Sequence, residues 1–253
     1  MKTPLILRLY ESQLVQIILA GVIYALYASV LGIALAPSVW LMVSALEALK
    51  AAGASWTIGS FAMAGLAAGA AVYVYFLWGA CFMALMVRII SAGTKPGRYP
   101  KTSFTTIRWL IHSGIHTIAM RSILPFIPVS YFCNLYFKIL GAKIAKNVYI
   151  NTPMVADAYL LTLEEGVIIG GNAEVTCHIM ERDHLVLSPI RIGRDSLVGT
   201  GAYVSPGVTI GARCTIGARC YIRRGVTIPD GSIYTVIAGL PIRTAYEIEK
   251  GSN

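Results

Sequence analysis

Apolar residues gather in two long stretches near the N-terminus. Residues 14–36 contain no charged side chain, and residues 51–87 form a second uncharged stretch that ends at Arg88. A helix needs about 20 consecutive apolar residues to cross a bilayer, and both stretches reach that length. We therefore expect two transmembrane helices, the first over residues 14–36 and the second near residues 63–87, joined by a connection over residues 37–55.

The pattern becomes amphipathic between residues 102 and 138. Polar residues recur there at helical spacing, opposed by an apolar face that contains Ile107, Leu110, Ile111, Ile115 and Ile118; the polar set is Thr105, Arg108, His112 and His116. Such a helix is suited to lie in the membrane interface. His112 and His116 have the spacing of a metal-chelating pair, but no acidic or cysteine partner is near. We interpret them as the polar face of an interfacial helix.

The last part of the chain repeats every six residues. From Ile192 the blocks read IGRDSL, VGTGAY, VSPGVT, IGARCT, IGARCY, IRRGVT and IPDGSI. The same frame returns upstream from Leu163, Ile169 and Val175, and more loosely from Ile144 and Ile150. This period predicts a coil of three short strands per turn, with one aliphatic side chain pointing inward from each strand.

A coil of this kind makes a specific packing prediction. Because three blocks complete a turn, we expect Ile192, Ile210 and Ile228 to stack in one internal column, about 4.8 Å apart. Two further columns should pair Val198 with Ile216 and Val204 with Ile222. The glycine after the aliphatic residue is expected to permit a tight corner, and Cys214 and Cys220 are expected to fill the core.

Composition and charge support a membrane location. The chain is 56% hydrophobic and only 13% charged, whereas an ordinary soluble domain is about 25% charged. Positive charges flank the two apolar stretches on one side, which predicts that both termini are cytoplasmic; these residues are Lys2, Arg8, Arg88, Lys95, Arg98 and Lys101. The net charge of +9 indicates attraction to an anionic inner leaflet, and no nucleic-acid-binding motif is present.

The repeats carry a resemblance to a known family. They are interrupted at residues 181–189, restart with P-I-R-I-G from Pro189, and end with A-G-L-P-I-R at Arg243. In these features the chain resembles hexapeptide-repeat acyltransferases. The resemblance implies a left-handed parallel β-helix that forms a homotrimer and transfers an acyl group from coenzyme A.

A looser resemblance extends further upstream. The motifs are K-P-G-R-Y-P from Lys95, Arg108-Trp109, L-G-A-K-I from Leu140, and Thr176-Cys177-His178. They look like the membrane-anchored C-terminal modules of polylysine-synthetase-type nonribosomal peptide synthetases. No adenylation or carrier domain accompanies them in this sequence.

Together these patterns predict four parts. Residues 1–101 form a two-span transmembrane anchor, and residues 102–139 form amphipathic interfacial helices. Residues 140–242 form the left-handed β-helix acyltransferase domain, and residues 243–253 form a C-terminal helix or tail. We expect a multi-pass protein of the inner (cytoplasmic) membrane with the β-helix on the cytoplasmic side.

His178 is the strongest candidate for a catalytic residue. It lies where the regular repeats give way to the excursion, and a histidine has a pKa suited to accept a proton from an acceptor hydroxyl or amine. The resemblance places the catalytic histidine of sugar-acetylating relatives at this point. His184, inside the excursion, is the second candidate. Four carboxylates could orient the base, and the sequence does not rank them: Glu181, Asp183, Glu174 and Asp157, which lies about one turn earlier.

The remaining site residues follow from the resemblance alone. It implies that the backbone amide of Thr200 stabilises the oxyanion. It also implies contacts to the donor from Gly217, Ala218, Arg223, Arg224 and Arg243, although Arg223-Arg224 replaces the Thr-Lys of many relatives. In family trimers the donor lies between neighbouring chains, so that one chain holds half a site.

These observations favour a membrane-anchored acyltransferase with no metal. Its donor is an acyl-CoA, acetyl-CoA foremost, or a phosphopantetheine thioester on a carrier protein. Its acceptor is a hydroxyl or amine of a membrane-associated saccharide, lipid or peptide. A γ-type carbonic anhydrase shares the fold but needs three histidines around zinc, and the repeats offer only His178 and His184. The alternative is a non-catalytic trimeric membrane scaffold or export component.

Overall fold

The structure, a computed structural model, describes residues 13–53, 55, 57–235 and 243–244. The chain divides into two compact units, Met1–Met83 and Ala84–Asn253. The charges predicted to precede the first span, Lys2 and Arg8, lie outside the described residues, and so does most of the predicted C-terminal segment, residues 245–253.

Two long apolar helices begin the described chain. Helix α2 covers Gln13–Ala51 and helix α3 covers Ile58–Ser91, and both are long and apolar enough to cross a membrane. Most of the connection expected over residues 37–55 is helical, because α2 continues through Pro37 to Ala51. A proline removes one backbone donor, and the Leu- and Ala-rich sequence that follows it favours continuation of the helix.

Helix α4 (Phe104–Ser122) is capped at its start by Ser103, whose side chain accepts a hydrogen bond from the Thr106 amide. Its histidine face is buried, which contradicts the interpretation of His112 and His116 as an interfacial polar face. His116 lies with Nδ1 2.7 Å from the Tyr136 hydroxyl and Nε2 2.8 Å from the Val155 carbonyl oxygen. Because its ring is satisfied by these partners, the polar stripe packs inward, and the apolar side chains of Phe104, Ile107 and Leu110 are exposed.

A short 3-10 turn, η1 (Leu124–Phe126), and helix α5 (Tyr131–Leu140) lead into the repeats. Helix α5 is capped at its start by the Ser130 side chain and ends at Gly141, which has a left-handed conformation. The second turn of 3-10 helix, η2, covers Ala158–Leu160.

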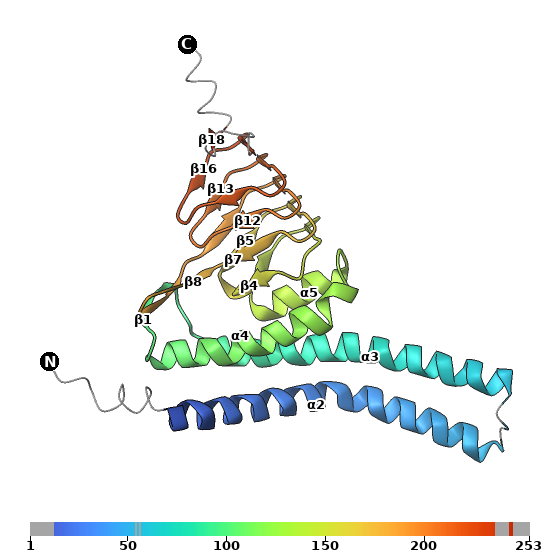
Figure 1. Cartoon of the computed structure of the whole chain (residues 1–253). Helices are drawn as coiled ribbons and strands as arrows, with labels where there is room; N and C mark the ends of the chain where they lie inside the picture. The colour runs from blue at the N-terminus through green and yellow to red at the C-terminus, as the bar shows by residue number, and fades with distance from the viewer. Residues whose placement is uncertain (1–12, 54, 56, 236–242, 245–253) are drawn as a thin grey trace, which may run out of the picture. The chain divides into compact units, whose positions relative to one another are not determined.

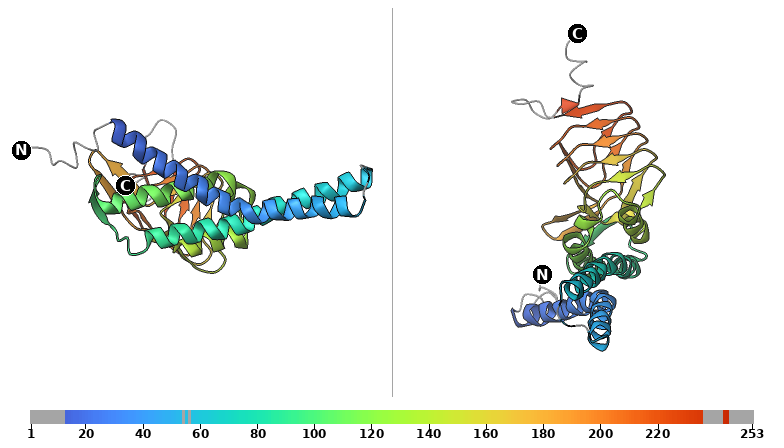
Figure 2. Two further views of the ribbon diagram at one scale, coloured as in Figure 1. Left: turned by 90° about the horizontal axis from the view of Figure 1, so that it is seen from below. Right: turned by 90° about the vertical axis from the view of Figure 1, so that its right-hand side faces the viewer.

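The repeats form a left-handed β-helix with three sheets, and in each sheet the strands of successive coils lie side by side (Figures 1 and 2). The first sheet holds β2 (Lys143–Ile144), β5 (Leu161–Leu163), β10 (Ile190–Ile192), β13 (Thr209–Ile210) and β16 (Thr227–Ile228). The second holds β3 (Tyr149–Ile150), β6 (Ile168–Ile169), β11 (Leu197–Val198), β14 (Thr215–Ile216), β17 (Ile233–Thr235) and β18 (Arg243–Thr244). The third holds β4 (Val155–Ala156), β7 (Glu174–Thr176), β12 (Tyr203–Val204) and β15 (Tyr221–Ile222).

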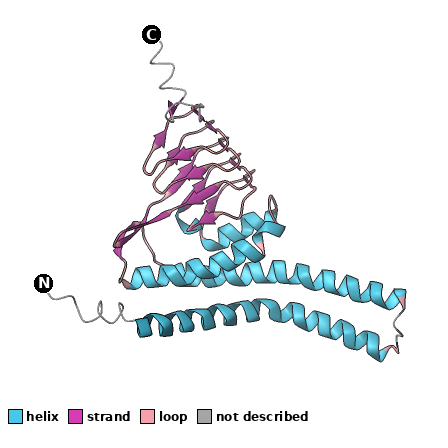
Figure 3. Cartoon of the chain, viewed as in Figure 1, coloured by secondary structure: helices cyan, strands magenta, loops and turns pink. Residues whose placement is uncertain are grey.

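The strand register confirms the three predicted columns. Ile192 pairs with Ile210, which pairs with Ile228. Val198 pairs with Ile216, and Val204 pairs with Ile222. All seven of these side chains are buried, and so are Cys214 and Cys220, as expected for core fillers. Figure 3 shows the repeat region as short strands, in magenta, that alternate with turns.

The glycine that follows the aliphatic residue has a different role from the one predicted. A Cβ atom on Gly199 would lie 2.6 Å from the backbone nitrogen of Ala218 in the next coil, and one on Gly193 would lie 2.5 Å from the Gly211 carbonyl carbon. These glycines therefore allow close stacking of coils. The left-handed backbone of each corner falls two residues after this position, at residues six apart along the chain: Asp195, Gly201, Gly207, Arg213, Arg219, Gly225 and Gly231.

The interruption of the repeats is an antiparallel hairpin. Strand β8 (His178–Glu181) pairs with β9 (His184–Leu187), and the upstream strand β1 (Gly97–Pro100) pairs with the other edge of β9. The amide of Lys101 also donates to the Asp183 carbonyl oxygen over 2.8 Å. The segment just after α3 thus becomes part of the same small sheet as the excursion.

Candidate active site

Asp157 and His178 come together where β4 stacks beneath β7. Ala156 pairs with Thr176 in parallel register, so the residues that leave these two strands lie one above the other. Nδ1 of His178 is 2.5 Å from Oδ2 of Asp157. Since a carboxylate accepts only, Nδ1 carries the proton and Nε2 carries the lone pair. The pair has the arrangement of a base with its orienting carboxylate.

Asp157 is buried and bound on both oxygens. Its side chain is 1% exposed, whereas that of His178 is 26% exposed. Oδ1 accepts a hydrogen bond from the indole Nε1 of Trp109 at 3.0 Å and a longer one from the Tyr159 hydroxyl at 3.4 Å. Burial acts to raise the pKa of Asp157, but the His178 hydrogen bond and charge, with smaller contributions from His112 and Trp109, lower that pKa below its usual range.

Asp157 also has a left-handed backbone, with φ of 54°, and it begins η2 without capping that turn. Aspartate tolerates this conformation better than most residues. The local backbone therefore directs the carboxylate toward His178 and Trp109, away from its own turn.

The titratable neighbours of this pair are neutral at physiological pH. Burial lowers the pKa of His112 to about 4 and also lowers the pKa of His116. Burial raises the pKa of the Cys177 thiol and of the Tyr159 hydroxyl, and the Asp157 charge adds to both shifts. Asp157 is thus a buried carboxylate beside four groups whose pKa shifts favour their neutral forms, and His178 is its hydrogen-bond partner.

A groove of about 430 Å³ opens beside His178. One wall is the face of α4 that carries Ser113, Thr117 and Met120, and the other is formed by the start of the hairpin with Ile179 and Met180. Glu174 and Tyr203 close one side, and the groove is lined by no lysine or arginine. A substrate in this groove would lie against the imidazole.

Thr200, Gly217 and Ala218 lie on a different edge of the β-helix. The Thr200 amide stacks above Gly170, and the Ala218 amide stacks above Gly199. These corners precede the strands of the third sheet, whereas His178 follows β7 in the same sheet. Within one chain, the Thr200 amide expected to stabilise the oxyanion therefore lies at the opposite end of the third sheet's strands from the His178 imidazole. The same holds for Gly217 and Ala218, which are expected to contact the acyl donor.

Arg223 and Arg224 follow β15 and lie on the same edge as the hairpin. Arg224 forms an ion pair with Glu181, and Glu181 also contacts Arg98 at 3.2 Å. Arg98, Glu181 and Arg224 line a pocket of about 300 Å³ with Ser188 and Gly207. These arginine contacts lower the pKa of Glu181. Glu181 is therefore placed to link the hairpin to the coil, and Asp157 is the carboxylate that contacts His178.

The other predicted residues are placed as follows. His184 pairs in register with Glu181 and Pro100, at the far end of the hairpin from His178, which pairs with Leu187. Asp183 forms an exposed ion pair with Lys101. The backbone of Arg243 begins β18. Cys177 is buried, in keeping with a core or corner role.

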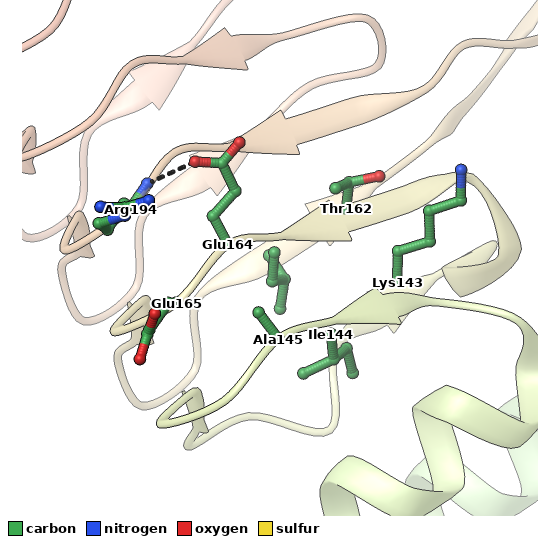
Figure 4. Close-up of a pocket in the computed structure, with 8 residues that line it drawn as sticks. Lys143, Ile144, Ala145, Thr162, Glu164, Glu165 and Arg194 are labelled. Carbon is green, nitrogen blue, oxygen red and sulfur yellow. Dashed lines mark hydrogen bonds between the residues drawn. The ribbon is translucent and has the colours of Figure 1, made fainter.

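Another cavity, of about 570 Å³, lies on another face of the β-helix (Figure 4). Glu164 dominates it, accepting from the Arg194 amide at 3.0 Å and pairing with Arg191. Its lining includes Lys143 and Thr162 but no histidine, cysteine or serine. Glu164 is engaged there by Arg191 and Arg194, and His178 does not line this cavity. No cluster of three metal-ligating side chains was found in the described part of the chain.

Two contributions to the site were not predicted from the sequence. Trp109, from a helix nearly fifty residues before Asp157, donates to its carboxylate, and β1 extends the hairpin sheet. Both are long-range contacts between segments without a shared repeat. The upstream motifs K-P-G-R-Y-P and Arg108-Trp109 were the signals that could have pointed to them.

Comparison with known proteins agrees with the repeats. Residues 189–232 match the family described as bacterial transferase hexapeptide (six repeats). A delta-poly-L-ornithine synthetase from Acinetobacter baumannii is 31% identical over 164 residues, which are 64% of this chain and 12% of that protein. The chain thus spans only a small part of this relative, and the alignment is longer than the matched repeats.

Solved structures with a similar arrangement are acetyltransferases of low identity. A maltose O-acetyltransferase from Clostridium difficile 630 is 16% identical, with 65% of this chain and 94% of that chain covered and a TM-score of 0.43. A galactoside acetyltransferase in complex with coenzyme A is 16% identical, covering 61% and 90%, with a TM-score of 0.44. Residues 189–232 thus match hexapeptide repeats of the bacterial transferase type, in a chain that is similar to part of a delta-poly-L-ornithine synthetase.

Proposed function

We propose that this chain is an acyltransferase in which His178 is the general base. The observation that carries the proposal is the hydrogen bond between His178 and the buried Asp157, beside an open groove. The hexapeptide repeats and the similarity to part of a delta-poly-L-ornithine synthetase support the same class of reaction.

The proposed reaction needs one base and no change of oxidation state. Nε2 of His178 takes the proton of an acceptor hydroxyl or amine as the oxygen or nitrogen attacks the thioester carbonyl carbon. The tetrahedral intermediate then expels the thiolate, which recovers the proton from the imidazolium. Asp157 holds the required tautomer and stabilises the imidazolium while it exists.

The donor we propose is acyl-CoA, with acetyl-CoA as the first choice, or a carrier-bound phosphopantetheine thioester. Arg224, Arg98 and Ser188 line a pocket on the His178 edge, and arginine suits phosphate groups by charge and geometry. The acceptor would enter the groove between α4 and the hairpin. The acceptor class is a hydroxyl or amine on a membrane-associated saccharide, lipid or peptide.

We further propose that the active form is a homotrimer. The predicted site residues divide between two edges of the third sheet, with His178 and Arg224 on one edge and Thr200, Gly217 and Ala218 on the other. A neighbouring copy can present its Thr200 edge to the His178 edge of the first chain. Native mass spectrometry is expected to give the mass of three copies.

We also propose a membrane location, with the β-helix on the cytoplasmic side of the inner membrane, and the two long apolar helices α2 and α3 support membrane association. Each is longer than the roughly 20 residues that a span requires. An anchor of this kind holds the enzyme beside a lipid-borne acceptor and raises their effective concentration.

The test uses the full-length protein in native membranes with radiolabelled acetyl-CoA. Replacing His178 with alanine is expected to abolish label transfer to membrane material while the oligomer stays intact. The matched control is His184→Ala, which removes the other histidine of the hairpin and is expected to retain transfer. Unchanged transfer by His178→Ala would reject the base, and an intact trimer without transfer in the wild-type protein would favour the membrane-scaffold alternative.

A further inference from the structure

We propose that Trp109, which lies on helix α4 outside the repeats, is a positioning residue for the Asp157–His178 pair. This proposal rests on the acyltransferase function proposed above. It assigns to α4 a direct part in the chemistry of a site whose base and carboxylate both belong to the β-helix.

Trp109 touches both members of the pair. Its indole Nε1 donates to Oδ1 of Asp157 at 3.0 Å, while His178 uses the other oxygen, Oδ2. Its ring also meets the His178 ring edge-on, with centroids 4.7 Å apart and planes 63° from parallel. The carboxylate is thereby hydrogen-bonded to the indole through one oxygen and to the imidazole through the other. The same indole ring packs against the imidazole ring.

The indole N–H of Trp109 matters because Asp157 is buried and has few other hydrogen-bond donors near it. A buried charge requires hydrogen bonds from its surroundings, and the next donor, the Tyr159 hydroxyl, is 3.4 Å away. The Thr176 hydroxyl contacts Nδ1 of His178, not the carboxylate. Removing the indole N–H would leave Oδ1 with one long hydrogen bond, so the carboxylate charge would be less compensated.

The groups that could otherwise set the charge of the site come from every element around it. They are His112, His116 and Arg108 of α4, Tyr99 of β1, Tyr159 of η2, Glu174 of β7, and Cys177. The guanidinium of Arg108 is engaged with the carbonyl oxygens of Ile90 and Ala92. A change in the titration of His178 caused by Trp109 would therefore act through Asp157.

The experiment compares wild-type protein with Trp109→Phe, which keeps an aromatic ring and loses the N–H. With less compensation at Oδ1, the carboxylate stabilises the imidazolium more strongly, and the pKa of His178 is expected to rise by about one pH unit. The acid limb of kcat/KM should move to higher pH by the same amount. We expect kcat to fall about tenfold, as for loss of a hydrogen bond to a charged group, with KM for acetyl-CoA changed by less than about twofold.

Histidine-labelled full-length protein in detergent micelles gives the pKa by NMR without any activity assay, and the His178 signal is identified by its loss in His178→Gln. The matched control is Ile115→Val, a buried change on the same helix, which should lower the melting temperature without moving that pKa. If Trp109→Phe does not fold, benzothienylalanine at position 109 replaces the N–H with sulfur in a ring of nearly the same shape.

An unchanged His178 pKa in both position-109 variants would overturn the proposal. So would a loss of activity that follows the loss of thermal stability, as in Ile115→Val, because that pattern marks a purely structural tryptophan. If wild-type protein transfers no acetyl group, the proposed function fails, yet the NMR comparison still decides whether Trp109 positions the pair.

Discussion

The coils before and after the hairpin differ in what they do. From Ile190 to Thr235 each block has six residues, and every inward side chain stacks on its equivalent in the next coil. The earlier coils, from Lys143 to Thr176, keep the register but contain extra residues, including η2 and the left-handed Asp157. The regular coils form a uniform stack, and the proposed base with its carboxylate lies where the period is broken.

This contrast is sharpest at Asp157. Replacing it with asparagine is expected to reduce kcat by about 10³- to 10⁴-fold, because an amide N–H facing Nδ1 forces the proton of His178 onto Nε2. Steady-state acetyl transfer by the purified protein measures this effect. Retention of more than about a tenth of wild-type kcat would show that the carboxylate does not set the tautomer.

In the regular coils, substitutions should reduce the stability of the fold and not the chemistry. Gly199→Ala places a Cβ 2.6 Å from the backbone of the next coil, so we expect a loss of about 3 kcal/mol in the free energy of unfolding, since overpacking against backbone cannot relax. The control is Gly225→Ala, at a corner with open space and φ of +70°, where left-handed strain costs about 1 kcal/mol. Chemical denaturation of both variants measures the difference. Equal losses would mean that stacking space is not what the repeat glycine provides.

Acid should weaken the helix-covered part of the molecule first. The pKa of His112 is about 4 in the folded protein and near its usual 6.5 when unfolded. The unfolded chain therefore takes up this proton first, and stability is lost as the pH falls from about 6.5 toward 4. The expected loss from His112 alone is about 2 kcal/mol by pH 5, measured by denaturation across that range. His112→Gln should flatten this dependence, and a slope as steep as that of the wild-type protein would exclude His112 as its source.

The smallest effect is expected at Glu181. Glu181→Gln removes exposed ion pairs with Arg98 and Arg224, which contribute little to stability, so the melting temperature should stay within error. We expect a modest change in KM for acetyl-CoA, because both arginines become free, and an unchanged kcat. A fall in kcat comparable with that of Asp157→Asn would restore Glu181 as a catalytic residue.

The sequence alone predicted the regular coils well and the site only in part. A strict period of six specifies which side chains point inward, so the columns through Ile192, Val198 and Val204 followed directly from counting. The partner of His178 could not be chosen by counting, because the coil between Asp157 and His178 departs from that period. Four carboxylates remained open until the register of β4 and β7 was known.

The helices before the repeats were harder for a related reason. The α4 sequence has a polar stripe and an apolar stripe, and the pattern does not say which one another element covers. In the structure both histidines are buried, and His116 is hydrogen-bonded to Tyr136 and Val155. Trp109 lies on that covered face, and its partner is 48 positions away, beyond the reach of any local pattern.

Strand β1 limits how this molecule can be dissected. A recombinant fragment that starts at Leu140 would retain the stacked coils and their buried columns. It would lack Gly97–Pro100, which leaves one edge of β9 unpaired, and it would lack the indole that binds Asp157. Such a fragment would lack groups that contact the proposed site, so biochemical work on this chain should retain the residues that follow α3.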